Sequence, residues 1–342
     1  MQADLTASGP PVNPVLTRIW RGAHVESQHR GAWVLVDSAG HVIESAGEPD
    51  QPVFARSSIK SLQALPLCET GAAERFGYSD DELALALASH DGELIHTERV
   101  ERVLRRLGLG PEHLQCGPQA PGSAATRDAL RRAGIEPTAL HNNCSGKHAG
   151  FLALTKHLGA DPAHYLDPES PTQRLVRQAV EELSGASGKQ IATAVDGCSA
   201  PTFRLPLARL ATAIARIANP AGLGRERRAA CERMQRAVAA HPDLIAGTRK
   251  RLCTDLARVS GGGLFPKIGG EAVYLIGAVG RDRGLAIKVD DGSYRGFQAL
   301  ILELCQRWGW LDASQAAALE AWRERTLTNW AGRSVGRIEV VA

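Results

Sequence analysis

Lysine is scarce in this sequence, and long apolar runs are missing from it. Only seven of the 40 basic residues are lysine, and the others are arginine. Because a guanidinium group stays protonated, arginine cannot replace a lysine that must lose its proton, so each lysine within a motif carries extra weight. No apolar run is long enough to span a bilayer, and the first residues show neither the basic segment nor the apolar core of a signal peptide. We therefore expect a cytoplasmic protein without a membrane partner.

The charge pattern and the cysteines exclude two further classes of protein. The net charge is only +3, and no basic run is interleaved with aromatic residues, so we expect no nucleic-acid partner. The seven cysteines are odd in number and scattered along 342 residues, which argues against a disulfide framework. Cysteines in unusual sequence contexts are therefore candidates for metal binding or chemistry.

A Ser-x-x-Lys pattern stands where an extended segment is expected to turn into a helix, within residues 55–67. Residues three apart on a helix are surface neighbours, so Lys60 is expected beside Ser57. A serine needs an adjacent base to act as a nucleophile, and a lysine serves as that base only when burial or a nearby cation lowers its pKa. The pattern alone leaves open the alternative that Ser57 caps the helix and Lys60 is solvated. Apolar neighbours that would bury the lysine are Ile59, Leu62, Leu65 and Leu67.

The order of the expected elements predicts an α+β fold. The strands near both ends of the chain are expected to share one antiparallel sheet that packs against helices. We predict a single catalytic domain over residues 1–342, with a largely helical region inserted between residues 75 and 260. The expected strands are 15–21, 31–45 (a hairpin), 191–195, 265–270, 271–279, 284–291 and 335–341, and the polar segment 26–30 is expected to connect two strands. The expected helices include 79–89, 93–107, 124–133, 171–183, 207–218, 225–240, 248–260, 296–308 and 314–327.

Two later elements extend the serine and lysine pattern. The penicillin-recognising serine enzymes combine a Ser-x-x-Lys at a helix start with a second serine on a helical loop and a Lys-Thr-Gly on a late strand. Here Ser89 and Lys267 follow the Ser57 motif in that order. Ile268 departs from the Lys-Thr-Gly pattern, and residues 89–91 depart from the Ser-Asp-Asn pattern. These departures weaken a prediction of β-lactam substrates.

A second group combines cysteines with a lysine. Cys144 and Lys147 are three residues apart at an expected helix start, where backbone N–H groups would stabilise a thiolate. Together with Cys198 they offer two thiolates and a nitrogen to zinc, and they would leave one coordination position open. Spacing alone leaves open that both cysteines are ordinary buried residues.

Five spaced motifs together resemble the asparaginase II family, the inducible, thermolabile type found in Rhizobium. The likeness runs from the early Glu26-Ser27-x-His29 segment to the late strands. It implies a fold similar to serine β-lactamases and glutaminases, and an L-asparagine amidohydrolase that releases L-aspartate and ammonia. The motifs are 55–60 (Ala-Arg-Ser-x-x-Lys), 88–90 (Ala-Ser-His), 143–148 (Asn-Cys-Ser-Gly-Lys-His), 196–201 (Asp-Gly-Cys-x-x-Pro) and 267–269 (Lys-x-Gly).

The resemblance also implies roles for individual residues. Two Ser-Lys pairs would form the reaction centre, a zinc ion would be bound without any organic cofactor, and two charged side chains would line the substrate site. Members of the family tend to form homodimers. The implied residues are Ser57 with Lys60 and Ser89 with Lys267 in the reaction centre, Cys144, Lys147 and Cys198 on the zinc, and Arg56 and Asp196 on the substrate.

The expected mechanism is a two-step acyl transfer. Neutral Lys60 takes the proton of Ser57, which attacks the side-chain amide of asparagine. Ammonia leaves with a proton delivered through Ser89 and Lys267, and water then hydrolyses the aspartyl ester. Three alternatives stay open: a related Ser-Lys hydrolase such as a glutaminase or a β-lactamase-like esterase, a non-catalytic amide or metal sensor, and a cysteine as the nucleophile in place of Ser57.

Overall fold

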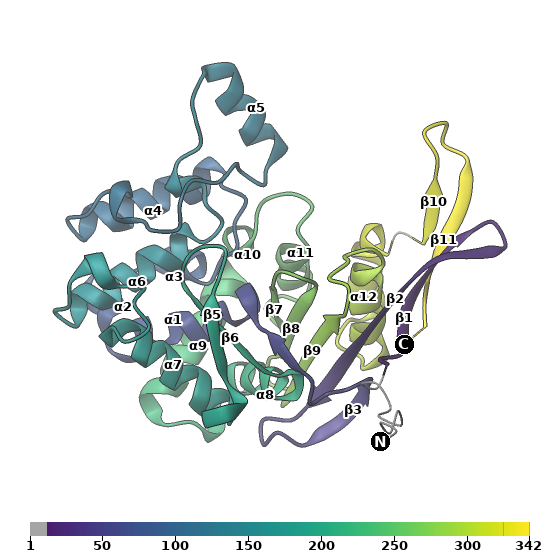
Figure 1. The fold of residues 1–342 in the computed structure, drawn as a ribbon, viewed down its shortest axis with the longest axis horizontal. Coiled ribbons are helices and arrows are strands. Elements are labelled where there is room, and N and C mark those ends of the chain that lie inside the picture. Colours follow the sequence, from purple (N-terminus) through teal and green to yellow (C-terminus); the bar gives the residue numbers. More distant parts are fainter. Residues whose placement is uncertain (1–11, 324, 342) are drawn as a thin grey trace, which may run out of the picture.

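The computed structural model describes residues 12–323 and 325–341, and its centre is a curled antiparallel sheet packed against helices (Figure 1). The strand order in the main sheet is β10-β11-β1-β2-β9-β8-β7, with β3 paired to β2, and a small second sheet has the order β4-β6-β5. These strand pairs are all antiparallel. The strands are β1 (Val15–Arg21), β2 (His24–Val36), β3 (Val42–Ala46), β4 (Pro52–Phe54), β5 (Ala192–Val195), β6 (Pro201–Pro206), β7 (Leu264–Ile268), β8 (Val273–Ala278), β9 (Arg283–Val289), β10 (Thr326–Thr328) and β11 (Ser334–Val340).

Most helices lie between β4 and β7 along the chain. In Figure 1 they gather beside the β7 edge of the main sheet, whereas β10, β11 and the tip of the β1–β2 pair project at the opposite edge. The helices are η1 (Arg56–Ile59, a 3-10 turn that leads into α1), α1 (Lys60–Glu69), α2 (Ala72–Arg75), α3 (Asp80–Ala86), α4 (Leu94–Arg106), α5 (Ala124–Ala133), α6 (Ser145–His157), α7 (Pro171–Ser184), α8 (Leu207–Ala218), α9 (Arg225–Ala240), α10 (Pro242–Ile245), α11 (Leu252–Val259), α12 (Phe297–Arg307) and α13 (Ala313–Ala318).

Two glycines let α8 lie directly on the main sheet. A β-carbon at Gly277 of β8 would sit 2.5 Å from the Cβ of Ala218, and one at Gly284 of β9 would sit 2.3 Å from the carbonyl oxygen of Ala211. Only a residue without a side chain allows helix and strand to approach so closely. Helix α8 therefore packs on β2, β8 and β9, while α12 packs on β1 and β11.

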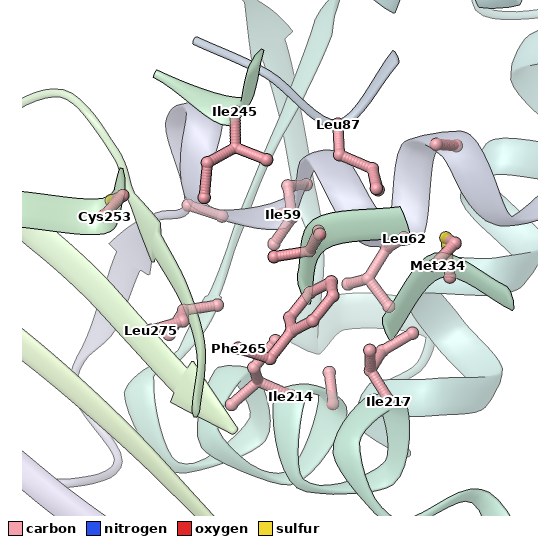
Figure 2. Close-up of a cluster of buried hydrophobic side chains, with 14 of the residues drawn as sticks. Ile59, Leu62, Leu87, Ile214, Ile217, Met234, Ile245, Cys253, Phe265 and Leu275 are labelled. Carbon is pink, nitrogen blue, oxygen red and sulfur yellow. The ribbon is translucent and has the colours of Figure 1, made fainter. Parts of the chain in front are cut away.

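A continuous apolar core joins the sheet to the helices that carry the candidate site. Figure 2 shows part of it, where side chains from η1, α1, α8, α9, α10, α11, β7 and β8 meet. Ile59, Leu87 and Phe265 belong to this part and are at most 4% exposed. Each of them lies within two residues of a predicted serine or lysine of the site. Because core side chains are close-packed, each of those site residues has an anchored neighbour.

The topology confirms the α+β class and the sheet shared by the terminal strands. Several expected boundaries are wrong, and one of them is the helix expected from residue 248, because α11 begins only at Leu252. Residues 26–30 do not connect strands, because they lie within β2 and face β1. The helix expected over residues 314–327 is too long, because α13 ends at Ala318 and β10 pairs with β11. The short strands β4, β6 and β10 were missed.

The helical region expected between residues 75 and 260 holds α3 to α11, and β5 and β6 lie among them. Its status as an insertion within one domain stays a prediction. Within residues 12–323 and 325–341, none of the helices combines the length and the apolar character that crossing a membrane requires.

Candidate active site

Ser57 lies in the η1 turn, three residues before the lysine that begins α1. No side chain caps this turn, so Ser57 does not act as a helix cap. Its neighbour Ser58 is fully buried and donates a hydrogen bond of 2.7 Å to the carbonyl of Ala55, and Ser61 is also buried. Ser57 is only half-buried. Among the serines around this turn, it is the one that a substrate can reach.

Lys60 is fully buried, and its amine is turned toward two backbone carbonyls. The Nζ atom donates to the carbonyl of Ala88 and, at 3.3 Å, to the carbonyl of Asn143. These acceptors belong to two other predicted motifs, which the fold therefore brings to η1. Burial is the main cause that lowers the pKa of Lys60, and the charge of Lys147 lowers it further. Within the described part of the chain, no hydrogen bond joins Lys60 to the Ser57 hydroxyl.

The second predicted pair, Ser89 with Lys267, is joined directly. The Nζ atom of Lys267 donates to the Ser89 hydroxyl oxygen at 2.8 Å and to the carbonyl of Ile268 at 3.0 Å. Ser89 follows α3 in an irregular segment, and Lys267 lies on β7, the edge strand of the sheet. Pro266, which has no N–H to donate, suits an edge strand. Both members of the pair are buried.

Burial also changes the acid–base chemistry of Lys267. It is the largest cause that lowers the pKa of this lysine to about 7, and repulsion from Lys60 acts in the same direction. A lysine with such a pKa is partly neutral near neutral pH, so it can both accept and donate a proton. The fold thus brings two buried amines to consecutive residues of one segment. Lys60 donates a hydrogen bond to Ala88, and Lys267 donates one to Ser89.

The predicted cysteine group also converges. Lys147 Nζ lies 3.1 Å from Cys198 Sγ, and Cys198 Sγ lies 3.7 Å from a carboxylate oxygen of Asp196. Cys144 Sγ lies 2.9 Å from Oδ1 of Asn143, and the backbone carbonyl of the same asparagine accepts a hydrogen bond from Lys60 at 3.3 Å. The cysteine group therefore adjoins the lysine of the first Ser-Lys motif.

The charges in this group favour one thiolate. The hydrogen bond from Cys198, together with the ammonium groups of Lys60 and Lys147, lowers the pKa of Cys144 well below its usual value, although burial opposes them. Burial lowers the pKa of Lys147, but the charges of the neighbouring sulfurs outweigh this effect, so the pKa of that lysine is raised. The two thiols are best described as sharing one negative charge between two lysines.

The donor types in this group fit zinc in part. Within the described residues, no group of three or more His, Cys, Asp and Glu side chains could hold a metal ion. The predicted set contains two cysteines, Cys144 and Cys198, and its third donor is the amine of Lys147. Sulfur and nitrogen donors suit zinc, and one ligand position would stay open. The amine would have to lose its proton to bind, and the raised pKa of Lys147 opposes that loss.

Arg56, the first residue of η1, forms an ion pair with Asp196, with 2.5 Å between Nε and Oδ1. Burial raises the pKa of Asp196, but the hydrogen bond and the charge of Arg56 outweigh it and hold the pKa below its usual value. The backbone of Arg56 has a φ of 51°, which is strained for a residue with a side chain. Gly270 leaves room for the guanidinium, because a β-carbon there would lie 3.2 Å from its Nη1. The pair places a cation and an anion next to Ser57.

The early Glu26-Ser27-x-His29 segment makes its contacts elsewhere. Its glutamate pairs with Arg21, and the His29 ring nitrogen lies 2.7 Å from Asp291. It makes no hydrogen bond to the predicted site residues in the described part of the chain.

Sequence reasoning missed the residues that hold the Ser89 segment in place. The backbone N–H of Ser89 donates to the carbonyl of Ile245 at 3.0 Å, and its carbonyl accepts from Arg251 Nη2 at 2.9 Å. Arg251 is 162 residues away along the chain. No short sequence pattern could have revealed this partner.

Ile268, which departs from the Lys-Thr-Gly pattern, does not disturb its neighbour Lys267. It lines a small cavity with Phe297 of α12. Successive side chains on a strand point to opposite faces, so Ile268 and Lys267 face different sides of β7. A larger cavity of about 720 Å³, lined by Tyr294 and Trp322 among others, also includes none of the predicted site residues.

Two solved structures share low identity with the chain. A β-lactamase from Mycobacterium bovis is 14% identical, with 81% of this chain and 94% of that chain covered and a TM-score of 0.42. Mglu in its native form in the presence of 4.3 M NaCl is 16% identical, with 87% and 64% covered and a TM-score of 0.36. None of the curated proteins compared matches the sequence.

The sequence itself matches the family described as L-asparaginase II over residues 17–340. This range includes the five motifs and the buried serine, lysine and cysteine groups that they form. The chain therefore belongs to the L-asparaginase II family.

Proposed function

We propose that this protein is an L-asparagine amidohydrolase that releases L-aspartate and ammonia by acyl transfer to a serine. The observation that carries the proposal is that two buried lysines from different elements contact consecutive residues of one segment. Lys60 bonds the carbonyl of Ala88, and Lys267 bonds the hydroxyl of the next residue, Ser89. Buried lysines with lowered pKa values are the bases that a serine nucleophile requires. Membership of the L-asparaginase II family supports asparagine as the substrate.

Ser57 is the proposed nucleophile. It is the accessible serine of η1, and it precedes Lys60 by one turn. In the first step the neutral amine of Lys60 takes the hydroxyl proton while the oxygen attacks the amide carbon. In the described residues no hydrogen bond commits the Ser57 hydroxyl to another group, so it is available to turn toward this amine.

Lys267 and Ser89 are proposed to return that proton to the leaving nitrogen. The proton held by Lys60 passes to neutral Lys267, then through the Ser89 hydroxyl to the amide nitrogen as the C–N bond breaks and ammonia departs. Water then attacks the aspartyl ester and regenerates Ser57. The cycle is balanced, because the proton removed from the serine is the one that leaves with ammonia.

Two backbone N–H groups are proposed to stabilise the oxyanion. Those of Ser57 and Gly270 donate to no backbone acceptor among the described residues. An unpaired N–H is expected in the first turn of a helix. The two chain segments are close, because a β-carbon at Gly269 would lie 3.2 Å from the backbone nitrogen of Ser58. Removing one such donor typically costs about 10²–10³ in kcat.

Arg56 and Asp196 are proposed to recognise the charged α-groups of asparagine. The guanidinium would pair with the α-carboxylate and the carboxylate with the α-ammonium. The support is their position beside Ser57 and the lowered pKa of Asp196, which keeps that carboxylate ionised.

An ammonia assay on two serine variants tests the nucleophile. Ser57→Ala is expected to lower asparagine-dependent ammonia release by at least about 10³-fold, since a nucleophile has no substitute. Ser61→Ala is the matched control, because the Ser61 hydroxyl is buried without a hydrogen-bond partner and contributes nothing that alanine would lose. Both variants should keep the wild-type melting temperature. Turnover by folded Ser57→Ala within about threefold of wild type would remove Ser57 from this role.

The same assay separates the rival functions. Asparagine should release ammonia faster than glutamine, and a β-lactam should not be opened. Faster turnover of glutamine or of the β-lactam would assign a related Ser-Lys hydrolase instead. Stoichiometric asparagine binding without product would indicate a sensor, and inactivation by thiol alkylation together with an active Ser57→Ala would indicate a cysteine nucleophile.

We also propose that Cys144, Lys147 and Cys198 bind Zn²⁺. When bound, the ion would anchor or orient the substrate, because the serine already supplies the nucleophile. Cys198→Ala should lower the zinc content of the purified protein, measured by mass spectrometry of the metal. Cys305→Ala removes a buried cysteine of α12 and should leave the zinc content unchanged. Equal zinc in both variants would refute the ligand assignment.

A homodimer, also implied by the family resemblance, is tested by sedimentation velocity of the same samples.

A further inference from the structure

The segment that carries Ser89 is irregular, so its backbone polar groups need partners outside regular structure. Both main-chain partners of Ser89 come from one stretch, residues 245–251, which consists of the last residue of α10 and the loop that leads to α11. The backbone N–H of Ser89 donates to the carbonyl of Ile245, and the guanidinium of Arg251 donates to the carbonyl of Ser89. Ser89 is therefore held on both sides of its α-carbon by the same stretch.

Arg251 is itself fixed by a buried partner. It precedes α11, and its Nη1 pairs with the carboxylate of Asp91, which is 10% exposed. That carboxylate lies between two glycines: a β-carbon at Gly122 would sit 2.1 Å from its Oδ1, and one at Gly247 would sit 2.5 Å from its Oδ2. The close fit restricts the carboxylate, and with it the guanidinium, to one position.

We propose that Arg251 is a positioning residue of the reaction centre, which holds the main chain of Ser89 so that its hydroxyl meets the amine of Lys267. The inference rests on the proposed function, because it concerns the same proton relay. Arg251 bonds the Ser89 carbonyl and not the hydroxyl, so it acts on the relay through the position of the serine.

The charge of Arg251 gives the proposal a second consequence. The titratable groups that face Lys267 are Lys60, Cys253, Arg251 and Cys144. Beyond the effect of burial, the cations Lys60 and Arg251 lower the pKa of Lys267, and the two cysteines raise it. Removing the guanidinium is therefore expected to raise the pKa of Lys267. An arginine that only stabilised the loop would change the melting temperature without this titration shift.

Three variants separate the positioning effect of Arg251 from the effect of its charge. Arg251→Met removes the hydrogen bonds and the charge. Arg251→Lys keeps the charge but cannot contact Asp91 and the Ser89 carbonyl through two nitrogens, and Arg258→Met is the matched control. Arg258 lies on α11 and pairs with Asp243 and Asp255 at the surface. The readouts are kcat and KM for asparagine, the pH profile, the melting temperature, and the titration of ¹³Cε-labelled lysines by NMR. With only seven lysines in the chain, Lys267→Met suffices to assign the Lys267 signal.

The proposal predicts that Arg251→Met lowers kcat about tenfold or more while KM changes less than about threefold, because a small displacement of a reacting group has large effects on rate. Its Lys267 titration and the acid limb of its pH profile should move to higher pH. Arg251→Lys should lose kcat but keep a titration close to that of wild type. The proposal is overturned if folded Arg251→Met matches Arg258→Met in kcat, or if its Lys267 signal titrates as in wild type.

The two proposals fail in different ways. If the wild-type protein releases no ammonia from asparagine, the proposed function is wrong. The NMR titration then decides on Arg251 alone, because it reports on Lys267 without turnover: an upward shift in Arg251→Met supports the contact between the loop and the pair, and an unchanged signal overturns it.

Discussion

At the scale of single residues, burial governs the chemistry of the site. Lys60 is fully buried and Lys267 is 4% exposed. Water stabilises an ammonium group far better than a protein interior does, so both lysines lose their protons more readily than a solvated lysine. Ser57 keeps partial access to solvent. These three side chains thus comprise two buried amines and one reachable hydroxyl.

The pKa of Lys267 predicts a pH dependence. In the proposed relay Lys267 must be neutral to receive the proton from Lys60. Its neutral fraction grows as the pH rises through about 7, so the rate of ammonia release should increase over the same range. Steady-state kinetics between about pH 6 and pH 8 measures this, with melting temperatures to exclude unfolding. A rate that is flat or falls across that range would contradict a relay that starts with neutral Lys267.

The roles of these residues stay predictions, and some of their contacts differ from those that the sequence indicated. The order of Ser57, Lys60, Ser89 and Lys267 indicated two pairs, and the second pair is joined as expected. In the first pair the lysine bonds carbonyls of other segments, which the Ser-x-x-Lys spacing does not reveal. Arg251 was not predicted, because its role depends on a tertiary contact with a residue far away in the sequence.

At the scale of elements, the contact between β7 and η1 positions the site. Strand β7 carries Lys267 and is followed by Gly269, which touches the turn that carries Ser57. A β-carbon at Gly269 would lie 2.8 Å from the carbonyl oxygen of Ala55 and 3.2 Å from the backbone nitrogen of Ser58. A β-carbon at this position would therefore fit only if the strand and the turn moved apart.

Gly269→Ala should therefore reduce both stability and activity. The displaced turn is expected to lower the free energy of unfolding by about 1–3 kcal/mol, a usual cost of overpacking, and kcat about tenfold or more. Urea denaturation and the ammonia assay measure the two effects. Gly222→Ala is the control, because a β-carbon at Gly222 would meet no atom within 4 Å. Equal kcat for the two variants would show that this contact does not position the site.

Elements with strong local signals were predicted, and those formed by tertiary pairing were not. The capping box of Ser79 with Glu82 begins α3 as expected. By contrast, β4 has only three residues and exists because β6 pairs with it. The helix expected through residue 327 gives way to β10, which pairs with β11. Local propensity cannot foresee a strand that depends on a distant partner.

At the scale of the whole molecule, one core supports both the sheet and the site. Leu62 of α1 is 1% exposed and lies in the part of the core that Figure 2 shows, together with Phe265 of β7. Packing in this region fixes α1, which begins at Lys60, while the preceding turn η1 lies against β7, the strand that carries Lys267.

Leu62→Ala should destabilise the whole protein. The lost apolar contacts and the cavity left behind are expected to lower the free energy of unfolding by about 2–5 kcal/mol. Ile135→Ala is the control, since Ile135 is 55% exposed and its truncation should change stability by less than about 0.5 kcal/mol. Thermal and urea unfolding followed by circular dichroism provide the comparison. Equal stability of the two variants would mean that this core does not support the fold.

The overall class was predictable because strands near both ends of the chain have few simple arrangements other than one shared sheet. The order of the strands within the sheet was not, since it places β9 next to β2, with β8 and β7 beyond β9, although all three follow β2 by more than 200 residues. Alternation of apolar residues fixes which face of a strand is buried, but it does not fix which strand lies beside it.

The central claim is that the Ser57 hydroxyl attacks the asparagine amide and carries the acyl group. Rapid acid quenching of the protein during turnover, followed by peptide mass spectrometry, tests it most directly. An aspartyl ester should be found on the peptide that contains Ser57, and it should be lost in Ser57→Ala. Steady ammonia release with the acyl group on another residue, or without any acyl-protein, would contradict the account.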